Sequence, residues 1–153
     1  MKKTILTAIA SVLSVVLIAQ SYRGQANKSY FDKLNDRYSS GIFKSTQGTI
    51  LDLTGDNTTA IAYPNILDWM QGRVAGLQVY TFRSGTRIPF IRGHQAQIYI
   101  DEMPVSAGFL NALSSVDIAM IKVIKGPFAG SFGNGGGVIA IYTFKGDEEE
   151  EKE

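Results

Sequence analysis

The chain has 153 residues, of which 44% are hydrophobic and 19% are charged, with a formal net charge of +1 and no cysteine. This length and composition fit one globular domain and exclude a disordered chain. Without cysteine there can be no disulfide, no thiolate metal site and no lipid-modified N-terminal cysteine. The basic residues are too few and too scattered to indicate nucleic-acid binding.

Residues 1–19 have the pattern of a secretory signal peptide. Lys2 and Lys3 precede an apolar run over residues 5–19 that ends in small residues. A membrane anchor is the alternative, but the run is shorter than the about 20 residues that span a bilayer. We therefore expect cleavage near Gln20, export, and no membrane span in the mature protein.

The two ends of the mature chain are predicted to lie outside the folded domain. Residues 20–37 are polar and mixed, and form either a flexible leader or a short helix over residues 29–38 with Ser29 as its N-cap. The tail, residues 147–153, has six acids and one lysine and is predicted to be disordered. The body, residues 20–146, keeps 12 basic and eight acidic residues, a net charge of +4.

The first folded elements are a strand near residues 49–53 and a helix over residues 64–76. Pro64 suits the first helical turn. Four apolar residues then recur at three- and four-residue spacing and predict one buried face: Ile66, Leu67, Met70 and Val74. Trp69 falls off that face and is expected to be partly exposed, with packing inside the domain preferred to a role as an interface anchor.

Five further strands are predicted from apolar runs, at residues 77–82, 89–93, 98–100, 120–124 and 137–144. Pro104 is expected to stop strand pairing after the third of these. Lys122 and Lys125 alternate with apolar residues, which is typical of a half-exposed strand. Short helical turns are expected near Phe109 and at residues 116–118, the second capped by Ser115. The fold class is α+β, with a four- to five-stranded mixed sheet and two or three short helices, and the last two strands are predicted to be neighbours.

No group of residues predicts an enzyme or a bound cofactor. The glycine run 133–137 leads into a strand and lacks the lysine of a phosphate loop, so a tight turn is predicted there. His94 is the only histidine and cannot build a metal site without other ligands. Asp101 and Glu102 are adjacent, so they cannot face each other across a substrate, and Asp101 is expected to accept hydrogen bonds from turn amides.

Five sequence blocks, in this order and spacing, closely resemble the plug domain of TonB-dependent outer-membrane receptors, especially the branch found in Bacteroidetes nutrient transporters. The blocks are residues 66–79, 91–93, 97–105, 118–126 and 132–141. The resemblance implies a plug domain over residues 38–146. It also implies structural roles for six residues: Gly93, Asp101, Gly126, Gly133, Gly136 and Gly137. Glu102 stands where the family usually has glycine and Lys122 where it usually has an acid, which implies altered contacts.

In that family the plug fills a large β-barrel, and its arginines face acidic residues of the barrel wall. The resemblance therefore implies barrel or ligand contacts for Arg83, Arg87, Arg92 and His94, with an ordinary solvated surface as the competing interpretation. One expected function is to occlude or regulate a separately encoded outer-membrane β-barrel, either a nutrient receptor or a type 9 secretion translocon. The alternative is a periplasmic protein that binds a small ligand with residues 82–97. Either implies a periplasmic location, associated with the outer membrane in the first case.

Overall fold

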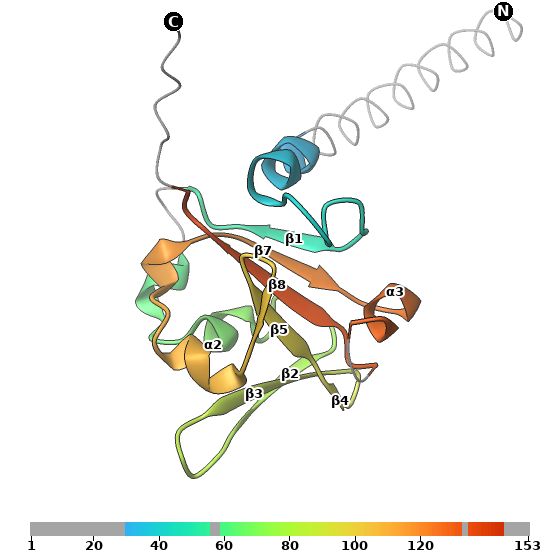
Figure 1. Ribbon diagram of the computed structural model, residues 1–153. Coiled ribbons are helices and arrows are strands. Elements are labelled where there is room, and N and C mark those ends of the chain that lie inside the picture. Colours follow the sequence, from blue (N-terminus) through green and yellow to red (C-terminus); the bar gives the residue numbers. More distant parts are fainter. Residues whose placement is uncertain (1–29, 56–58, 133–134, 146–153) are drawn as a thin grey trace, which may run out of the picture. The chain divides into compact units, whose positions relative to one another are not determined.

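The computed structural model describes residues 30–55, 59–132 and 135–145 (Figure 1). The chain divides into two units, Met1–Asn35 and Asp36–Glu153. Residues 30–38 are helical, and residues 30–35 are the only described part of the first unit. Ser29, the signal peptide and the acidic tail lie outside the described residues.

A five-stranded mixed sheet forms the centre of this unit, with strand order β1-β7-β8-β5-β6. The strands are β1 (Thr49–Asp52), β5 (Gln97–Ile100), β6 (Met103–Val105), β7 (Ile118–Ile124) and β8 (Val138–Thr143). β5 and β8 are parallel, and the other pairs are antiparallel. The α+β class and the mixed sheet are confirmed, as is the pairing of the last two strands, in which Ile121 lies opposite Ile141.

A second, three-stranded antiparallel sheet has the order β2-β3-β4. Its strands are β2 (Leu77–Thr81), β3 (Arg87–Ile91) and β4 (His94–Gln95). β2 and β3 correspond to two of the predicted strands; they pair as an antiparallel hairpin, and the turn that joins them contains Gly85 at φ 80°. β4 was not predicted, because its two exposed polar residues carry no hydrophobic pattern.

The helices are short. They are the α-helices α2 (Ile66–Met70) and α3 (Pro127–Gly130) and the 3-10 helices η1 (Thr59–Ala62), η2 (Ala107–Asn111) and η3 (Ser115–Asp117). α3 lies in the segment between β7 and β8 and was not predicted. η3 begins after Ser114, whose hydroxyl accepts from the Val116 N–H at 3.3 Å. The prediction of Ser115 as the cap is wrong, because its hydroxyl donates instead to the Tyr63 carbonyl, at 3.1 Å.

Helix α2 is shorter than predicted. It begins after Asn65, whose side-chain oxygen accepts from the Leu67 N–H at 2.9 Å, so Pro64 precedes the helix and is not in its first turn. It ends at Met70; the next residue, Gln71, has an extended backbone, and Gly72 follows with φ 87°. The predicted buried face is nevertheless correct, because its four apolar residues, Ile66, Leu67, Met70 and Val74, are all buried.

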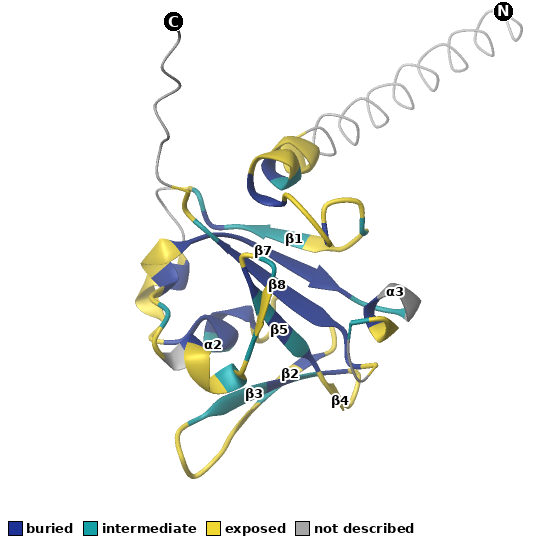
Figure 2. Cartoon of the chain, viewed as in Figure 1, coloured by how far each residue is buried: buried dark blue, intermediate teal, exposed yellow. Residues whose placement is uncertain are grey.

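Alternate residues of the central strands point to opposite faces of the five-stranded sheet, and both faces are covered (Figure 2). On one face, β5, β7 and β8 each contribute two isoleucine or valine side chains, which pack with residues of α2 and β3 in the main core. These residues are Ile98, Ile100, Ile121, Val123, Ile139 and Ile141. β7 is buried along its whole length, which explains why its sequence is apolar at every position except Lys122.

The other face of the sheet is covered by residues 39–44. The Phe43 ring is fully buried and lies edge-on to the rings of Tyr99 and Phe132, at centroid distances of 4.9 and 5.0 Å. Lys122 lies on this face and is only 2% exposed, so the prediction of a half-exposed lysine is wrong. Its Nζ donates to the Phe43 carbonyl at 2.6 Å. Burial lowers the pKa of Lys122, and the negative charge of Glu102 partly opposes that effect.

Pro104 lies inside β6, opposite Tyr99, so the prediction that it stops pairing is also wrong. β6 is the outer strand of the sheet. A proline is tolerated on an edge strand because its missing N–H faces away from the neighbouring strand.

Trp69 is 6% exposed, which corrects the expectation of partial exposure and confirms packing inside the domain. Its indole N–H donates to the Thr59 hydroxyl at 2.9 Å. The Arg73 guanidinium lies 4.7 Å from the ring centroid and donates to the Trp69 carbonyl at 2.8 Å. The 3-10 helix η1 and Arg73 therefore cover the side of α2 that the sequence pattern predicted to be partly exposed.

Candidate functional site

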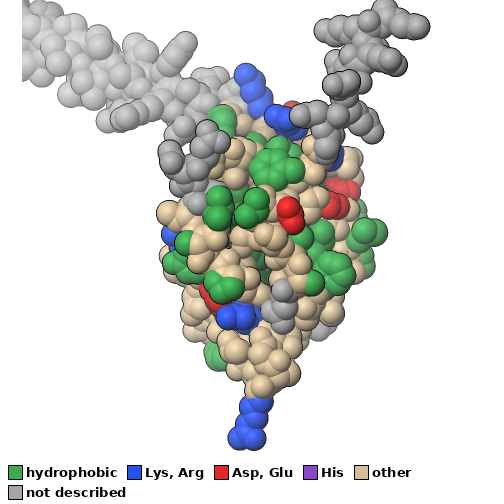
Figure 3. Space-filling view, turned by 90° about the vertical axis from the view of Figure 1, so that its left-hand side faces the viewer, with side chains coloured by type: hydrophobic (Ala, Val, Ile, Leu, Met, Phe, Trp, Pro, Cys, Tyr) green, Lys and Arg blue, Asp and Glu red, His purple; other side chains and the backbone are tan. Residues whose placement is uncertain are grey.

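The β2–β3 hairpin and the residues that flank it form a basic surface. Residues 71–100 contain four arginines and the only histidine, and no aspartate or glutamate. In Figure 3 a lysine or arginine side chain projects at the lower end of the view, where the hairpin turn lies, and no acidic side chain is visible beside it. A surface of this kind attracts an anionic partner.

Two of the four arginines are bound within the domain. The Arg87 Nε lies 2.8 Å from both carboxylate oxygens of Asp68, and the pair is half-buried. Arg73 is held by Trp69 and by the Thr59 hydroxyl, at 3.1 Å. Of the four predicted contact residues, Arg83, Arg92 and His94 are exposed, whereas Arg87 is half-buried.

Arg92 and Gly93 form the two-residue turn between β3 and β4. Both have positive φ, 54° and 82°, as a type I′ hairpin turn requires. The Lys125 ammonium donates to the nearby Ala75 carbonyl at 2.7 Å. Burial and the positive charge of Arg92 both lower the pKa of Lys125, burial more strongly. Two cations therefore lie close together at one end of the hairpin, and Arg83 lies in the turn at the other end.

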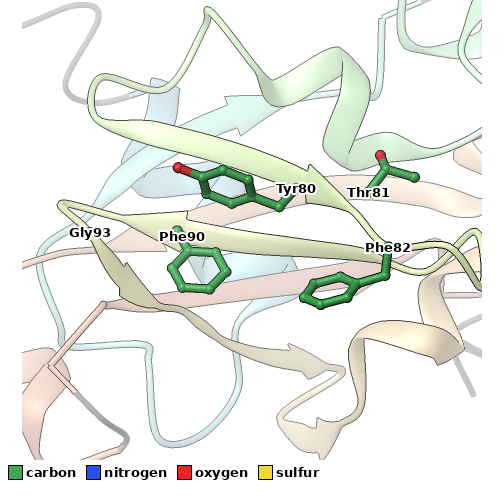
Figure 4. Close-up of a pocket in the computed structure, with 5 residues that line it drawn as sticks. All are labelled: Tyr80, Thr81, Phe82, Phe90 and Gly93. Carbon is green, nitrogen blue, oxygen red and sulfur yellow. The ribbon is translucent and has the colours of Figure 1, made fainter.

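Aromatic side chains line one face of the same hairpin (Figure 4). Tyr80 and Phe82 are 52% and 53% exposed, and the rings of Tyr80 and Phe90 meet edge to face at 5.1 Å. Together with Thr81 and Gly93 they line an open groove of about 450 Å³. The sequence contained the signal, because strand alternation places Tyr80 and Phe82 on the same face.

Asp101 and Glu102 form a second two-residue turn, between β5 and β6, with φ 46° and 67°. The Asp101 carboxylate accepts from the Thr143 N–H at 3.0 Å and from its hydroxyl at 2.7 Å. The expectation that Asp101 binds amides of its own turn is wrong, because the turn aims its carboxylate at the end of the parallel neighbour β8. The adjacent acids hold parts of the fold and do not form a catalytic pair.

The Glu102 carboxylate binds three consecutive backbone amides of residues 39–44. It accepts from the N–H groups of Ser40, Gly41 and Ile42 at 3.2, 2.7 and 3.2 Å. The Tyr142 hydroxyl lies 3.5 Å from the same carboxylate and 3.0 Å from the Ser39 hydroxyl. Burial raises the pKa of Tyr142 to about 12; the Ser39 hydrogen bond opposes this shift, and Glu102 and Asp101 add to it.

This shift predicts a pH dependence of stability. The folded-state pKa of Tyr142 lies above the unfolded value of 10, so its contribution is complete below pH 10 and is lost as the pH rises towards 12. We expect the difference in unfolding free energy between the wild type and Tyr142→Phe to decrease from pH 9 to pH 11.5 in urea titrations. Lys122 has a lowered pKa and the opposite sign, but it is present in both proteins and cancels. A difference that does not change with pH would contradict the assignment.

The predicted structural glycines have separate roles. Gly126 has φ 90° and precedes α3, Gly137 has φ 96° and precedes β8, and Gly133 lies outside the described residues. Gly136 packs against the backbone of β4: an added Cβ would collide with the carbonyl oxygens of His94 and Gln95. Within the part of the predicted turn that the structure describes, Gly135 and Gly137 have positive φ and Gly136 approaches a neighbouring backbone closely, as expected; residues 133 and 134 lie outside the described residues.

Among residues 30–55, 59–132 and 135–145, no cluster of three or more histidine or acidic side chains could hold a metal ion. Within the same residues, no helix has the length and apolar content needed to cross a membrane.

Comparisons with known proteins agree with this geometry. The family model for the TonB-dependent receptor plug domain matches residues 43–138. A structure of the RagAB peptide transporter superposes with a TM-score of 0.53 at 25% identity, over 69% of this chain and 13% of that chain. The siderophore receptor PirA from Acinetobacter baumannii gives a TM-score of 0.51 at 24% identity, over 67% of this chain and 18% of that chain. No curated protein sequence matches.

The chain thus spans less than a fifth of the length of these receptor chains. The family match covers more than half of the 153 residues, and the fold superposes on the RagAB and PirA structures with TM-scores of 0.53 and 0.51. On these grounds the chain belongs to the TonB-dependent receptor plug domain family.

Proposed function

We propose that the protein is a plug of the cell envelope that binds and occludes or regulates an outer-membrane β-barrel encoded separately, such as a nutrient receptor or a type 9 secretion translocon. Residues 1–19 would direct its export to the periplasm, where it would associate with the outer membrane. The supporting observation is the acid-free hairpin with Arg83, Arg92 and His94 exposed. Barrel interiors are polar and can present acids to such a surface.

Of the four residues that the sequence suggested as barrel contacts, we leave out Arg87. Arg87 is bound to Asp68, so replacing it would disturb the domain as well as the surface. Arg83 and Arg92 lie at opposite ends of the hairpin and are both exposed. The proposed barrel contact therefore rests on this pair, with His94 beside Arg92 across the second turn.

The test is recovery of the barrel from detergent-solubilised outer membrane with the tagged full chain. Exposed charge pairs contribute about 0–1 kcal/mol each, so single substitutions should change little. The double variant Arg83→Ser/Arg92→Ser should reduce recovery several-fold, and raised salt should reproduce that loss by screening.

The control variant Arg37→Ser/Lys44→Ser removes the same charge from two other exposed residues and should leave recovery intact, as should deletion of residues 147–153. If the hairpin variant retains the barrel and the tail deletion loses it, the interface is at the C-terminus and the proposal fails.

The aromatic groove favours a second candidate, the binding of a small ligand. Aromatic faces with a few polar groups suit peptides and sugars, and the similar structures include a peptide transporter and a siderophore receptor. In this case a ligand would stabilise the chain in the absence of any barrel, whereas the first proposal requires the barrel for any effect of Arg83 and Arg92.

A further inference from the structure

Residues 39–44 cover one face of the five-stranded sheet without belonging to it. We call this segment the strap. None of its residues is in a strand. Its backbone is held chiefly by side chains that the sheet supplies. The strap therefore lacks the ladder of backbone hydrogen bonds that makes sheet strands open together.

Two side chains of opposite charge bind the strap backbone, one at its N–H groups and the other at its carbonyl oxygens. Glu102 accepts from three of its N–H groups, those of Ser40, Gly41 and Ile42. Lys122 donates to two of its carbonyls, those of Phe43 at 2.6 Å and Lys44 at 3.4 Å. Hydrogen bonds to charged groups are stronger than neutral ones, so these two residues contribute strongly to the attachment, together with the buried Phe43 ring.

The fit around Glu102 is close. A Cβ on Gly41 would overlap the Glu102 carboxylate, so a side chain at residue 41 would require that carboxylate to move from its present position. Glu102 itself has φ 67°, a conformation that costs a non-glycine residue energy. The turn thus holds a strained glutamate, and that glutamate gains its compensating contacts from the strap.

The strap also carries the residue that closes the face. The Phe43 ring packs between Tyr99 and Phe132, and beneath the strap lie β7, which is buried along its whole length, and β8, which is buried except at Thr143. Departure of the strap would uncover these two aromatic rings and the Lys122 ammonium while leaving the sheet's own hydrogen bonds unbroken.

We propose that residues 39–44 are a releasable strap, clasped by Glu102 and Lys122, which opens as a unit without unfolding of the sheet and then exposes an apolar, basic face. This inference is independent of barrel binding, because none of these residues belongs to the basic hairpin.

The test is NMR-detected hydrogen exchange on the full chain. In the wild type the amides of Ser40, Gly41 and Ile42 should exchange at least about tenfold faster than those of Ile121 and Val123 in β7. Glu102→Gln and Lys122→Met should each speed exchange of the strap amides by about tenfold or more and leave the β7 amides within about twofold. Glu102→Gly should act more strongly on the strap without lowering the thermal midpoint, because glycine relieves the strain at φ 67°.

Asp101→Asn is the matched control. Asp101 is the other acid of the same turn, has positive φ as well, and contacts Thr143 and not the strap. It should leave exchange of the strap amides unchanged. The proposal is overturned if strap and β7 amides exchange at one common rate in the wild type, or if Asp101→Asn speeds the strap as much as Glu102→Gln does.

Discussion

Replacing Gly136 or Gly137 by alanine should destabilise the domain by about 1–3 kcal/mol or more, the usual cost of mutations that force backbone shifts in a packed core. At Gly136 a Cβ would collide with the carbonyl oxygens of His94 and Gln95. At Gly137 it would lie 2.7 Å from the Ile124 carbonyl oxygen, and φ 96° adds strain. These obstacles are backbone atoms, so no side-chain rotation can relieve them. Valine should cost more at both positions: at residue 137 a β-branched residue resists the positive φ, and at residue 136 it adds bulk where the backbone of residues 94 and 95 already leaves no space.

Urea unfolding monitored by circular dichroism measures this effect. Gly130→Ala is the control, because no atom lies within 4 Å of the added Cβ and its φ is not positive. We expect that variant to remain within about 0.5 kcal/mol of the wild type. If the alanine variants at residues 136 and 137 were as stable as the control, the close approach of this turn to β4 and β7 would be wrong.

The strands were predictable from the sequence because their signal is local. β7 and β8 are runs of β-branched and apolar residues ended by glycine or by polar residues, and such runs indicate strands whatever covers them. The order of the strands was not predictable at this level. β5 pairs in parallel with β8, about 40 residues later in the chain, and no feature of either run specifies its neighbour.

The errors share one physical cause, which is that a local pattern cannot show what covers each side chain. Lys122 lies in a strand pattern that permits an exposed lysine, but residues 39–44 lie over it. Pro104 ends pairing only in an interior strand, and β6 is an edge strand. Among the candidate contact residues, Arg87 could not be distinguished from Arg83, because its partner Asp68 lies on helix α2.

The two departures from the family pattern have a common structural explanation. The resemblance leads us to expect a turn glycine at residue 102 and an acid at residue 122, and the sequence indicated only that contacts at these positions are altered. In the structure both side chains reach residues 39–44, one through its amides and the other through its carbonyls. The strained backbone at Glu102 and the buried Lys122 thus both contribute to the attachment of residues 39–44. The negative charge of Glu102 also stabilises the ammonium form of Lys122.

Trp69→Ala should destabilise the domain by about 3–5 kcal/mol, the usual cost of emptying a buried aromatic site. The ring is 6% exposed and packs in the main core with α2. Its loss would also leave the Thr59 hydroxyl and the Arg73 guanidinium without their contact at the indole. Helix α2 positions Asp68, which binds Arg87 of the hairpin, so the damage should extend to the basic surface.

Trp69→Phe separates packing from the polar contacts. Phenylalanine fills most of the site but cannot donate to Thr59 and attracts Arg73 less strongly, so we expect a loss of about 1–2 kcal/mol. Because Trp69 is the only tryptophan, wild-type fluorescence should be blue-shifted and resist iodide quenching until the domain unfolds. A red-shifted, readily quenched emission together with a cost below about 1 kcal/mol for Trp69→Ala would place the ring at the surface. In that case the role of Trp69 as an interface anchor, which its burial argues against, would be the better interpretation.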